Sequence, residues 1–499
     1  MQIIRFILLL IVLNATQVRA QENRVLHQKL SAQQMQSDLH LLKKILEANH
    51  PGLYWYSTKE NIDTVFENTV AGISDSLTEV AFRNRVAAWV NEIKCGHTVV
   101  RMSKKWSGQQ LQKNKSQQFQ NQFPLQIKVW EDSLVVMANM NRKDALLKKG
   151  TIIHSINGQN NRELLSRMFT GISTDGNSIN HKNQVVSNSF PFWYTNYFGT
   201  DTLYHIRYTD GTGNKLTAAV QPFSYKPARP GKAMPDTVNR PEPAAMSKRQ
   251  MQQLMRRSLT VDTVHQTAVM RLTSFSKGSL KHFFRKSFRE IKKLGVKNLV
   301  IDLRNNGGGK VDNSILLTRF LSNHPFKIGD TVVAINRKFN YGRYIHGWLP
   351  FWFAMNIGGK KTADGAIHYR RYETHYFTPK ERNHFNGNLY LLQGGYTFSA
   401  ATMFIATLKG QQNTTVVGEE TGGGYYGNSA MHIPTIVLPS SGLRISLPMY
   451  RLVMDKNRPK GNGIIPDIII PPSSAAIKAG IDLKMDSVQS IIQQNLRKY

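Results

Sequence analysis

Cysteine and long apolar runs are scarce in this chain of 499 residues. The single cysteine, Cys95, cannot form an intrachain disulfide, which excludes a small extracellular module stapled by disulfides. No apolar run approaches the roughly 20 residues that a membrane-spanning helix needs. We therefore expect no transmembrane segment, and the length predicts about two to four domains.

Acidic side chains are also few, with 32 Asp and Glu against 65 Lys and Arg, a net charge of +33. Such an excess can attract nucleic acid, anionic lipid or acidic substrates. The basic residues are spread through every segment, and no zinc-finger, homeodomain or aromatic RNA-binding motif occurs. We therefore expect no specific nucleic-acid partner and favour an acidic envelope surface or ligand.

Residues 1–20 have the pattern of a secretory signal peptide. Arg5 precedes an apolar run over residues 6–13, and the small residue Ala20 stands at the expected cleavage point. No cysteine follows this point to accept a lipid. We expect a cleaved signal peptide and a periplasmic or secreted protein.

Two segments near the N-terminus have apolar residues at helical spacing, over residues 31–47 and 78–93. They predict an N-terminal helical domain over residues 21–105. From about residue 123 the pattern changes to short alternating strands, and residues 145–165 form a turn, strand, Asn-Gly turn and short helix. This arrangement resembles part of a PDZ domain, which binds extended peptides at a strand edge, and it predicts a PDZ-like domain over residues 106–222.

Residues 223–262 are expected to be a proline-rich linker followed by a basic helix over residues 247–259. Strands then alternate with helices over residues 263–478, which predicts an α/β core. A C-terminal helix is expected over residues 479–499. Within the core, residues 337–377 are an insertion rich in aromatic residues. It could form a lid over the active site, a surface that binds apolar tails, or a buried segment that only fills a groove.

Two distant segments of the α/β region carry the features of an acyl-transfer site. Residues 299–309 (LVIDLRNNGGG) predict a buried strand that ends in a glycine-rich loop with free backbone N–H groups. The second segment places Ser399 at the start of a helix over residues 400–409. Acyl transfer needs a nucleophile and donors for the developing oxyanion. Taken alone, Ser399 would be an ordinary helix N-cap.

The motifs of these segments occur together with others in a characteristic order. They are CGHT at 95–98, NLVIDLRNNGGG at 298–309, TFSAAT at 397–402, VVGEETGGG at 416–424 and GIIPD at 463–467. Together they resemble the tail-specific (C-terminal processing) serine peptidases, closer to the tricorn-core and retinoid-binding-protein-like branch. The resemblance implies a ClpP/crotonase-like core of β-α units and polypeptide substrates.

The resemblance also implies a role for individual residues. Ser399 matches the nucleophile and His97 the general base, while the amides of Ala400 and Gly308 match the oxyanion hole, with Gly307 as the near alternative to Gly308. The lysine base of the better-known branch is absent, because Gly424 occupies its position.

The acidic residue of the tricorn-like branch is also absent, because residues 460–462 are Lys, Gly and Asn. The group that orients His97 is therefore not identified from the sequence. Glu419 and Glu420 are expected to support loops, with the orientation of His97 as the alternative role. Asp302 and Arg304 are expected to brace the glycine-rich loop.

The sequence thus predicts an exported serine peptidase that cleaves polypeptides through Ser399 and His97. No metal and no cofactor are expected, because Cys95 and His97 alone are too few ligands for a metal ion. The alternative is a catalytically inactive family member that binds peptides or lipophilic ligands, with the aromatic insertion as its binding wall.

Overall fold

The computed structural model describes residues 29–115, 122–142, 144, 146–224 and 246–496. The expected signal peptide and most of the expected proline-rich linker lie outside these residues. Among the described helices, none combines the length and the apolar character that crossing a bilayer requires.

A six-stranded sheet organises the C-terminal half of the chain. Its order is β10-β11-β12-β17-β18-β23, and all neighbours run parallel except β10 and β11. The strands span Arg257–Asp262, Thr267–Leu272, Asn298–Asp302, Asn388–Gln393, Thr414–Gly418 and Ile468–Ile469, in that order. Parallel strands need crossover connections, so this sheet confirms the predicted α/β architecture.

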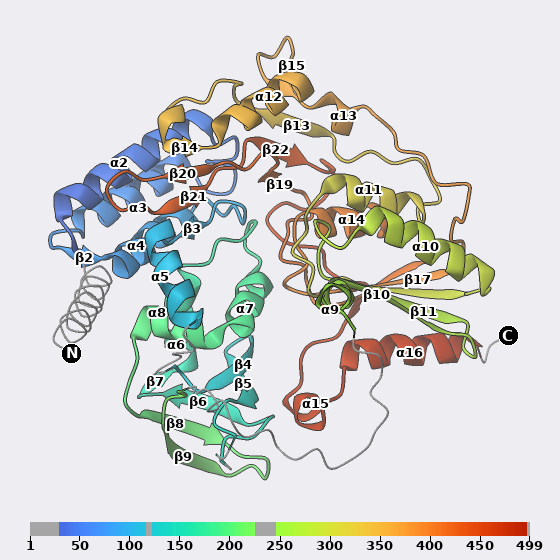
Figure 1. Cartoon of the computed structure of the whole chain (residues 1–499), viewed down its shortest axis with the longest axis horizontal. Helices are drawn as coiled ribbons and strands as arrows, with labels where there is room; N and C mark the ends of the chain where they lie inside the picture. Colours follow the sequence, from blue (N-terminus) through green and yellow to red (C-terminus); the bar gives the residue numbers. More distant parts are fainter. Residues whose placement is uncertain (1–28, 116–121, 143, 145, 225–245, 497–499) are drawn as a thin grey trace, which may run out of the picture.

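Helices cover both faces of this sheet (Figure 1). On one face lie α10, α11 and α14, which span Leu280–Lys293, Val311–Arg319 and Ala400–Leu408. On the other face lies α16 (Leu483–Leu496), which buries Val488 and Ile492 against Tyr390 and Leu392 of the sheet. Phe284, Phe288 and Ile291 form a buried apolar stripe on α10, and this cover on both faces leaves β12 fully buried.

The N-terminal helices pack into the core of the C-terminal half rather than around a core of their own. Buried side chains of α2 (Ala32–Asn49) and α4 (Glu79–Asn91) belong to one hydrophobic cluster with those of the six-stranded sheet. Ser31 and Gln34 form a capping box at the start of α2, which explains its predicted boundary. Two further helices span Lys59–Ala71 (α3) and Lys104–Lys115 (α5), and the short pair β1 and β2 spans Lys29–Leu30 and Leu77–Thr78.

A separate sheet of order β4-β5-β6-β8-β9, with β7 beside β6, has its own hydrophobic core. Its strands span Leu125–Trp130, Ser133–Asn139, Ile152–Ile156, Tyr204–Thr209 and Lys215–Val220, and β7 spans Gln159–Asn160. Three helices pack with it: α6 (Asn161–Phe169), α7 (Ile179–Asn188) and α8 (Phe190–Phe198). The expected strand and short helix correspond to β6 and α6, and the expected Asn-Gly turn, at residues 157–158, connects β6 to β7.

Two smaller antiparallel sheets contain the aromatic insertion and tie the N-terminal segment to the core. The first has the order β15-β16-β13-β22-β19, with strands Lys360–Lys361, Ile367–His368, Thr331–Ala334, Tyr450–Val453 and Gly427–Ala430. The second has the order β14-β20-β21-β3, with strands Ile345–His346, Thr435–Val437, Arg444–Ser446 and Val100–Arg101. The remaining elements are η1 (Gly342–Tyr344), α12 (Trp348–Gly358), α13 (Arg370–Glu373) and α15 (Ser474–Ala479).

The helix α9 spans Lys248–Arg256, so the expected basic helix is shorter than residues 247–259. Its last three expected positions belong to β10 instead, because Arg257, Ser258 and Leu259 pair with β11. The strand pairing with β11 therefore overrides the local helical pattern at these positions.

Candidate active site

Ser399 stands at the N-terminus of α14, in the loop that follows β17. Its backbone has φ 54° and ψ −124°, a conformation that is costly for any residue with a side chain. The side chain makes no capping hydrogen bond to the helix, although the residue occupies the N-cap position. The Ser399 hydroxyl therefore does not cap the helix, although a serine at this position usually does.

The ring of His97 reaches this hydroxyl from the other end of the chain. His97 follows α4 in the turn that leads to β3, and its Nε2 lies 3.0 Å from Oγ of Ser399. The His97 side chain is only 9% exposed, and its ring packs 4.9 Å from the ring of Phe398. The fold thus brings together the two residues that the sequence proposed as base and nucleophile.

Asp175 is the one carboxylate within 4.0 Å of the His97 ring among the described residues. Its Oδ1 lies 4.0 Å from Nδ1 of His97 and accepts a hydrogen bond from the N–H of Gly96 at 2.8 Å. The other oxygen accepts from the N–H of Gly424 at 3.5 Å. Nδ1 itself is buried and has no hydrogen-bond partner among the described groups.

Sequence reasoning missed Asp175. It lies in the loop between α6 and α7, outside every motif of the family, and its Asp-Gly dipeptide is an ordinary turn signal. The two acids that were considered have other partners: Glu420 accepts from the N–H of Gly463 at 2.7 Å, and Glu419 pairs with Lys484 at 2.7 Å.

Burial sets the protonation of the site. It lowers the pKa of His97 to about 4, with a smaller contribution from the nearby His181. Burial raises the pKa of Asp175 to about 7, against the opposing effect of the N–H groups of Gly96 and Gly424. The imidazole is therefore neutral at pH 7 and able to accept a proton.

Backbone amides lie next to the Ser399 hydroxyl. The N–H of Ala400, at the first turn of α14, has no acceptor among the described residues. Gly308 approaches so closely that an added Cβ would lie 2.7 Å from Cβ of Ser399 and 3.0 Å from N of Ala400. The N–H of Gly308 is engaged, however, because it donates to Oδ1 of Asn306 at 2.9 Å. The N–H of Gly307 makes no hydrogen bond within the described chain.

The loop that carries Gly308 is held by ionic contacts at its base. Arg304 pairs with Asp302 at 2.8 Å and with Asp482 at 2.6 Å. Asp302 ends β12 and Asp482 precedes α16, so the pairs connect the glycine-rich loop to the far face of the sheet.

The sequence offered only Cys95 and His97 as metal ligands, which are too few, and the structure places Asp175 beside them. Atoms of Cys95, His97 and Asp175 that can bind a metal all lie within 4.8 Å of one another. Burial raises the pKa of the Cys95 thiol to about 12, so this thiol is protonated at neutral pH. A thiol in this state is a poor ligand and a poor nucleophile.

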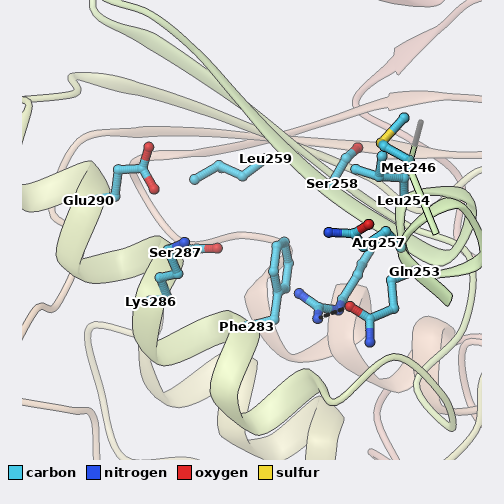
Figure 2. A pocket seen from close by; sticks show the side chains of 11 residues that line it. Met246, Gln253, Leu254, Arg257, Ser258, Leu259, Phe283, Lys286, Ser287 and Glu290 are labelled. Atoms are coloured by element: carbon cyan, nitrogen blue, oxygen red, sulfur yellow. Dashed lines mark hydrogen bonds between the residues drawn. The ribbon is translucent and has the colours of Figure 1, made fainter. Parts of the chain in front are cut away.

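A pocket of about 380 Å³ lies away from the catalytic pair, between α9 and α10 (Figure 2). Phe283 projects from α10 toward Arg257, whose guanidinium lies 4.5 Å from the centre of the ring. Neither Ser399 nor His97 lines it.

Residues 266–470 match Peptidase family S41. No curated protein matches the sequence. Among solved structures, the chain is similar to mature CPAF complexed with lactacystin, with 12% identity and a TM-score of 0.64 over 94% of this chain and 99% of that chain. Mature CPAF alone gives 12% identity and a TM-score of 0.63 over 94% and 98% of the two chains.

The match identifies residues 266–470 as a peptidase S41 domain, and it supports a serine-type peptidase of the tail-specific class. This confirms the family that the motifs indicated. The similarity to CPAF extends the shared fold along nearly the whole chain. Membership of a peptidase family implies polypeptide substrates.

Proposed function

We propose that the protein is an exported serine peptidase that cleaves polypeptides through an acyl-enzyme formed on Ser399. His97 is the general base, Asp175 positions it, and the amides of Ala400 and Gly308 hold the oxyanion. The observation that carries the proposal is the 3.0 Å contact between Nε2 of His97 and a Ser399 hydroxyl that makes no capping bond.

The reaction follows from this geometry. Nε2 of His97 takes the hydroxyl proton as Oγ of Ser399 attacks the scissile carbonyl carbon. The carbonyl oxygen becomes negative beside the N–H of Ala400, where the dipole of α14 also favours negative charge. The imidazolium then gives its proton to the leaving amine as the C–N bond breaks, and water releases the acyl group by the same steps.

Asp175 supports the charged intermediate. With the proton on Nδ1 of His97, a carboxylate 4.0 Å away stabilises the imidazolium and favours the tautomer that leaves Nε2 free. The second oxyanion donor in this proposal is Gly308, which exchanges its bond to Asn306 for the substrate oxygen, with Gly307 as the alternative.

We also propose an assignment of the parts of the fold to domains. The β-α units around β12, β17 and α14 form a ClpP/crotonase-like core, the N-terminal helices form its companion domain, and β4 to β9 form the PDZ-like unit. Its β4 edge lies beside α7, and there the N–H of Val129 already donates to Ser187 at 2.8 Å. Export is tested by sequencing the N-terminus of the mature protein, which should begin at Gln21.

A fluorophosphonate probe tests the nucleophile. Intact protein should be labelled, Ser399→Ala should not, and Ser166→Ala on α6 should be labelled like the intact protein. Casein hydrolysis should fall on the order of a millionfold in Ser399→Ala. Equal labelling of intact protein and Ser399→Ala would end the assignment.

A second candidate function is ligand binding without catalysis. The gap of 4.0 Å between His97 and Asp175 favours it, as does the exposure of apolar side chains on α12, where Ile357 is 86% and Phe353 53% exposed. This candidate predicts tight binding of an apolar dye and no casein hydrolysis. Hydrolysis that Ser399→Ala abolishes would exclude it.

A further inference from the structure

The helix α12 presents a row of apolar side chains to solvent. The exposed fractions are 40% for Trp348, 48% for Leu349, 53% for Phe353 and 86% for Ile357, while Met355 is the one buried residue of the helix. Leu349, Phe353 and Ile357 follow one another at intervals of four residues, so they form one stripe along the helix. A contiguous apolar surface of this kind marks an interaction site.

The opposite side of α12 fixes the helix to the body of the protein. Met355 belongs to the main hydrophobic cluster, and the ring of Phe351 lies 6.3 Å from the ring of His432. At the end of the helix, the guanidinium of Arg337 donates to the carbonyl oxygen of Gly359 at 2.6 Å. The helix is therefore held at the outer rim of the molecule, beside β15, with its apolar stripe turned outward (Figure 1).

Cations lie at both ends of the stripe. Lys360 and Lys361 follow the C-terminal end of α12, are exposed, and form no ion pair among the described residues. At the other end η1 contacts the helix, because a Cβ added to Gly342 would lie 3.8 Å from Cδ2 of Trp348. The exposed Arg343 belongs to η1 and lies at this end. Between residues 337 and 377, Lys and Arg occur at seven positions and acidic residues at two.

The two acidic residues of the insertion contact the same histidine. Oδ2 of Asp364 lies 3.0 Å from Nε2 of His368, and Oε1 of Glu373 lies 2.8 Å from Nδ1 of the same ring. Lys360 is opposite His368 in the pairing of β15 with β16, yet it forms an ion pair with neither carboxylate. Positive charge is therefore in excess around the apolar stripe.

This charge decides which partner fits the stripe. A two-fold contact between two copies would place the patch against itself, so that Arg343, Lys360 and Lys361 of one copy meet like charges of the other. The net charge of +33 opposes such a contact further. The fitting partner carries negative charge above an apolar interior. A membrane with anionic phospholipids has both properties.

We propose that α12 is an interfacial helix that docks the protein on a membrane containing anionic phospholipids. The 11 residues of α12 span about 16 Å, which is about half of a bilayer's hydrocarbon core, so the helix lies in the plane of the interface. Leu349, Phe353 and Ile357 enter the boundary between headgroups and acyl chains, and Trp348 lies at headgroup level. This inference goes beyond the proposed peptidase function and does not depend on it.

Sedimentation with vesicles tests the docking. The intact protein is mixed with vesicles of phosphatidylcholine, either alone or with phosphatidylglycerol, and the bound fraction is measured after centrifugation. We expect binding to the mixed vesicles that weakens at high salt, because salt screens exposed charges, and little binding to phosphatidylcholine alone. Absence of binding to the mixed vesicles would overturn the proposal.

A pair of matched substitutions tests the stripe. Ile357→Glu should lower the partition coefficient onto mixed vesicles at least roughly tenfold, because it removes an inserted side chain and adds a charge that the lipid repels. Val264→Glu is the control, because Val264 is 84% exposed in the turn between β10 and β11. It should bind like the intact protein. Melting temperatures show that both variants are folded, and equal binding by the two would exclude docking through α12.

A second pair of variants separates local from general charge. Lys360→Gln combined with Lys361→Gln should lower binding to mixed vesicles roughly tenfold. Lys292→Gln combined with Lys293→Gln removes two adjacent, exposed charges from the end of α10 and should have little effect. Equal losses from the two pairs would assign the binding to the net charge of the protein and overturn the proposal.

An environment-sensitive fluorophore reports insertion directly. Because the single cysteine, Cys95, is buried, a thiol-reactive fluorophore attaches selectively at Ile357→Cys or at the control Val264→Cys. On mixed vesicles the emission from position 357 should shift to shorter wavelength, and the emission from position 264 should not. A shift at position 357 that appears at high protein concentration without vesicles, and not upon their addition, would identify a contact between two copies and overturn the proposal.

Discussion

Nδ1 of His97 faces Oδ1 of Asp175 across 4.0 Å, in a buried site where Nδ1 has no other polar partner among the described groups. The pair joins the segment after α4 to the loop before α7. Because Oδ1 of Asp175 also accepts from the N–H of Gly96, the carboxylate is held in place by the residue next to the base. The proposed catalytic group is therefore assembled from three distant parts of the chain.

Replacement of His97 by Gln should strongly lower the rate of peptide hydrolysis while the protein stays folded. Gln has no group that accepts and returns a proton near neutral pH, and general acid–base catalysis contributes on the order of 10² to 10⁴ in rate. Casein turnover and thermal melting of His97→Gln check this. Turnover close to that of the intact protein would place the base elsewhere.

The pH profile of kcat/KM should rise in two steps. The first, near pH 4, is the deprotonation of His97, whose pKa burial lowers to about 4. The second, near pH 7, is the ionisation of Asp175, because a carboxylate 4.0 Å away makes the imidazole a stronger base. Asp175→Asn should keep the first step and lose the second. A single step near pH 6.5 in the intact protein would contradict this account.

Asp175→Asn should also be more stable than the intact protein at alkaline pH. The folded-state pKa of Asp175 is raised from 3.8 to about 7, so the folded protein binds more protons and loses stability as the pH rises through this range. Asn cannot ionise and avoids this loss, which is on the order of a few kcal/mol. Melting temperatures at pH 8 and pH 4 check the sign: the advantage of Asp175→Asn should be present at pH 8 and disappear near pH 4.

Gly308→Ala should remove activity through a steric clash. Gly308 has φ +93°, and an added Cβ would lie 2.7 Å from both the carbonyl oxygen of Phe398 and Cβ of Ser399. Gly213 is the matched control, because it has φ +94° and nothing within 4 Å of an added Cβ. Gly213→Ala should cost about 1–2 kcal/mol from backbone strain and leave hydrolysis intact. Equal activity of Gly308→Ala and Gly213→Ala would show that Gly308 is not part of the active site.

Features set by neighbouring residues were predicted well. Ser31 and the apolar spacing after it define α2, and the run at residues 299–303 was expected to be a buried strand, as β12 is. The helix after Ser399 was expected within one residue of its end. The helix α3 was missed, because only Ile62 and Phe66 of its thirteen residues are buried and the apolar stripe is correspondingly weak.

Features that depend on contacts through space were not predicted. Asp175 has no motif, and only its hydrogen bond from Gly96 and its distance to His97 mark it. The opposition of Arg101 and Arg444 arises from the pairing of β3 with β21, which the local pattern of neither strand specifies.

By itself, the sequence determined the family and nominated a serine, a histidine and a pair of amides, because these lie in short motifs whose spacing is local. Only the tertiary structure decided that the serine hydroxyl contacts the imidazole and that a buried carboxylate lies behind the ring. Such distances and pairings depend on how helices and sheets pack. Local sequence patterns do not specify that packing for side chains hundreds of positions apart.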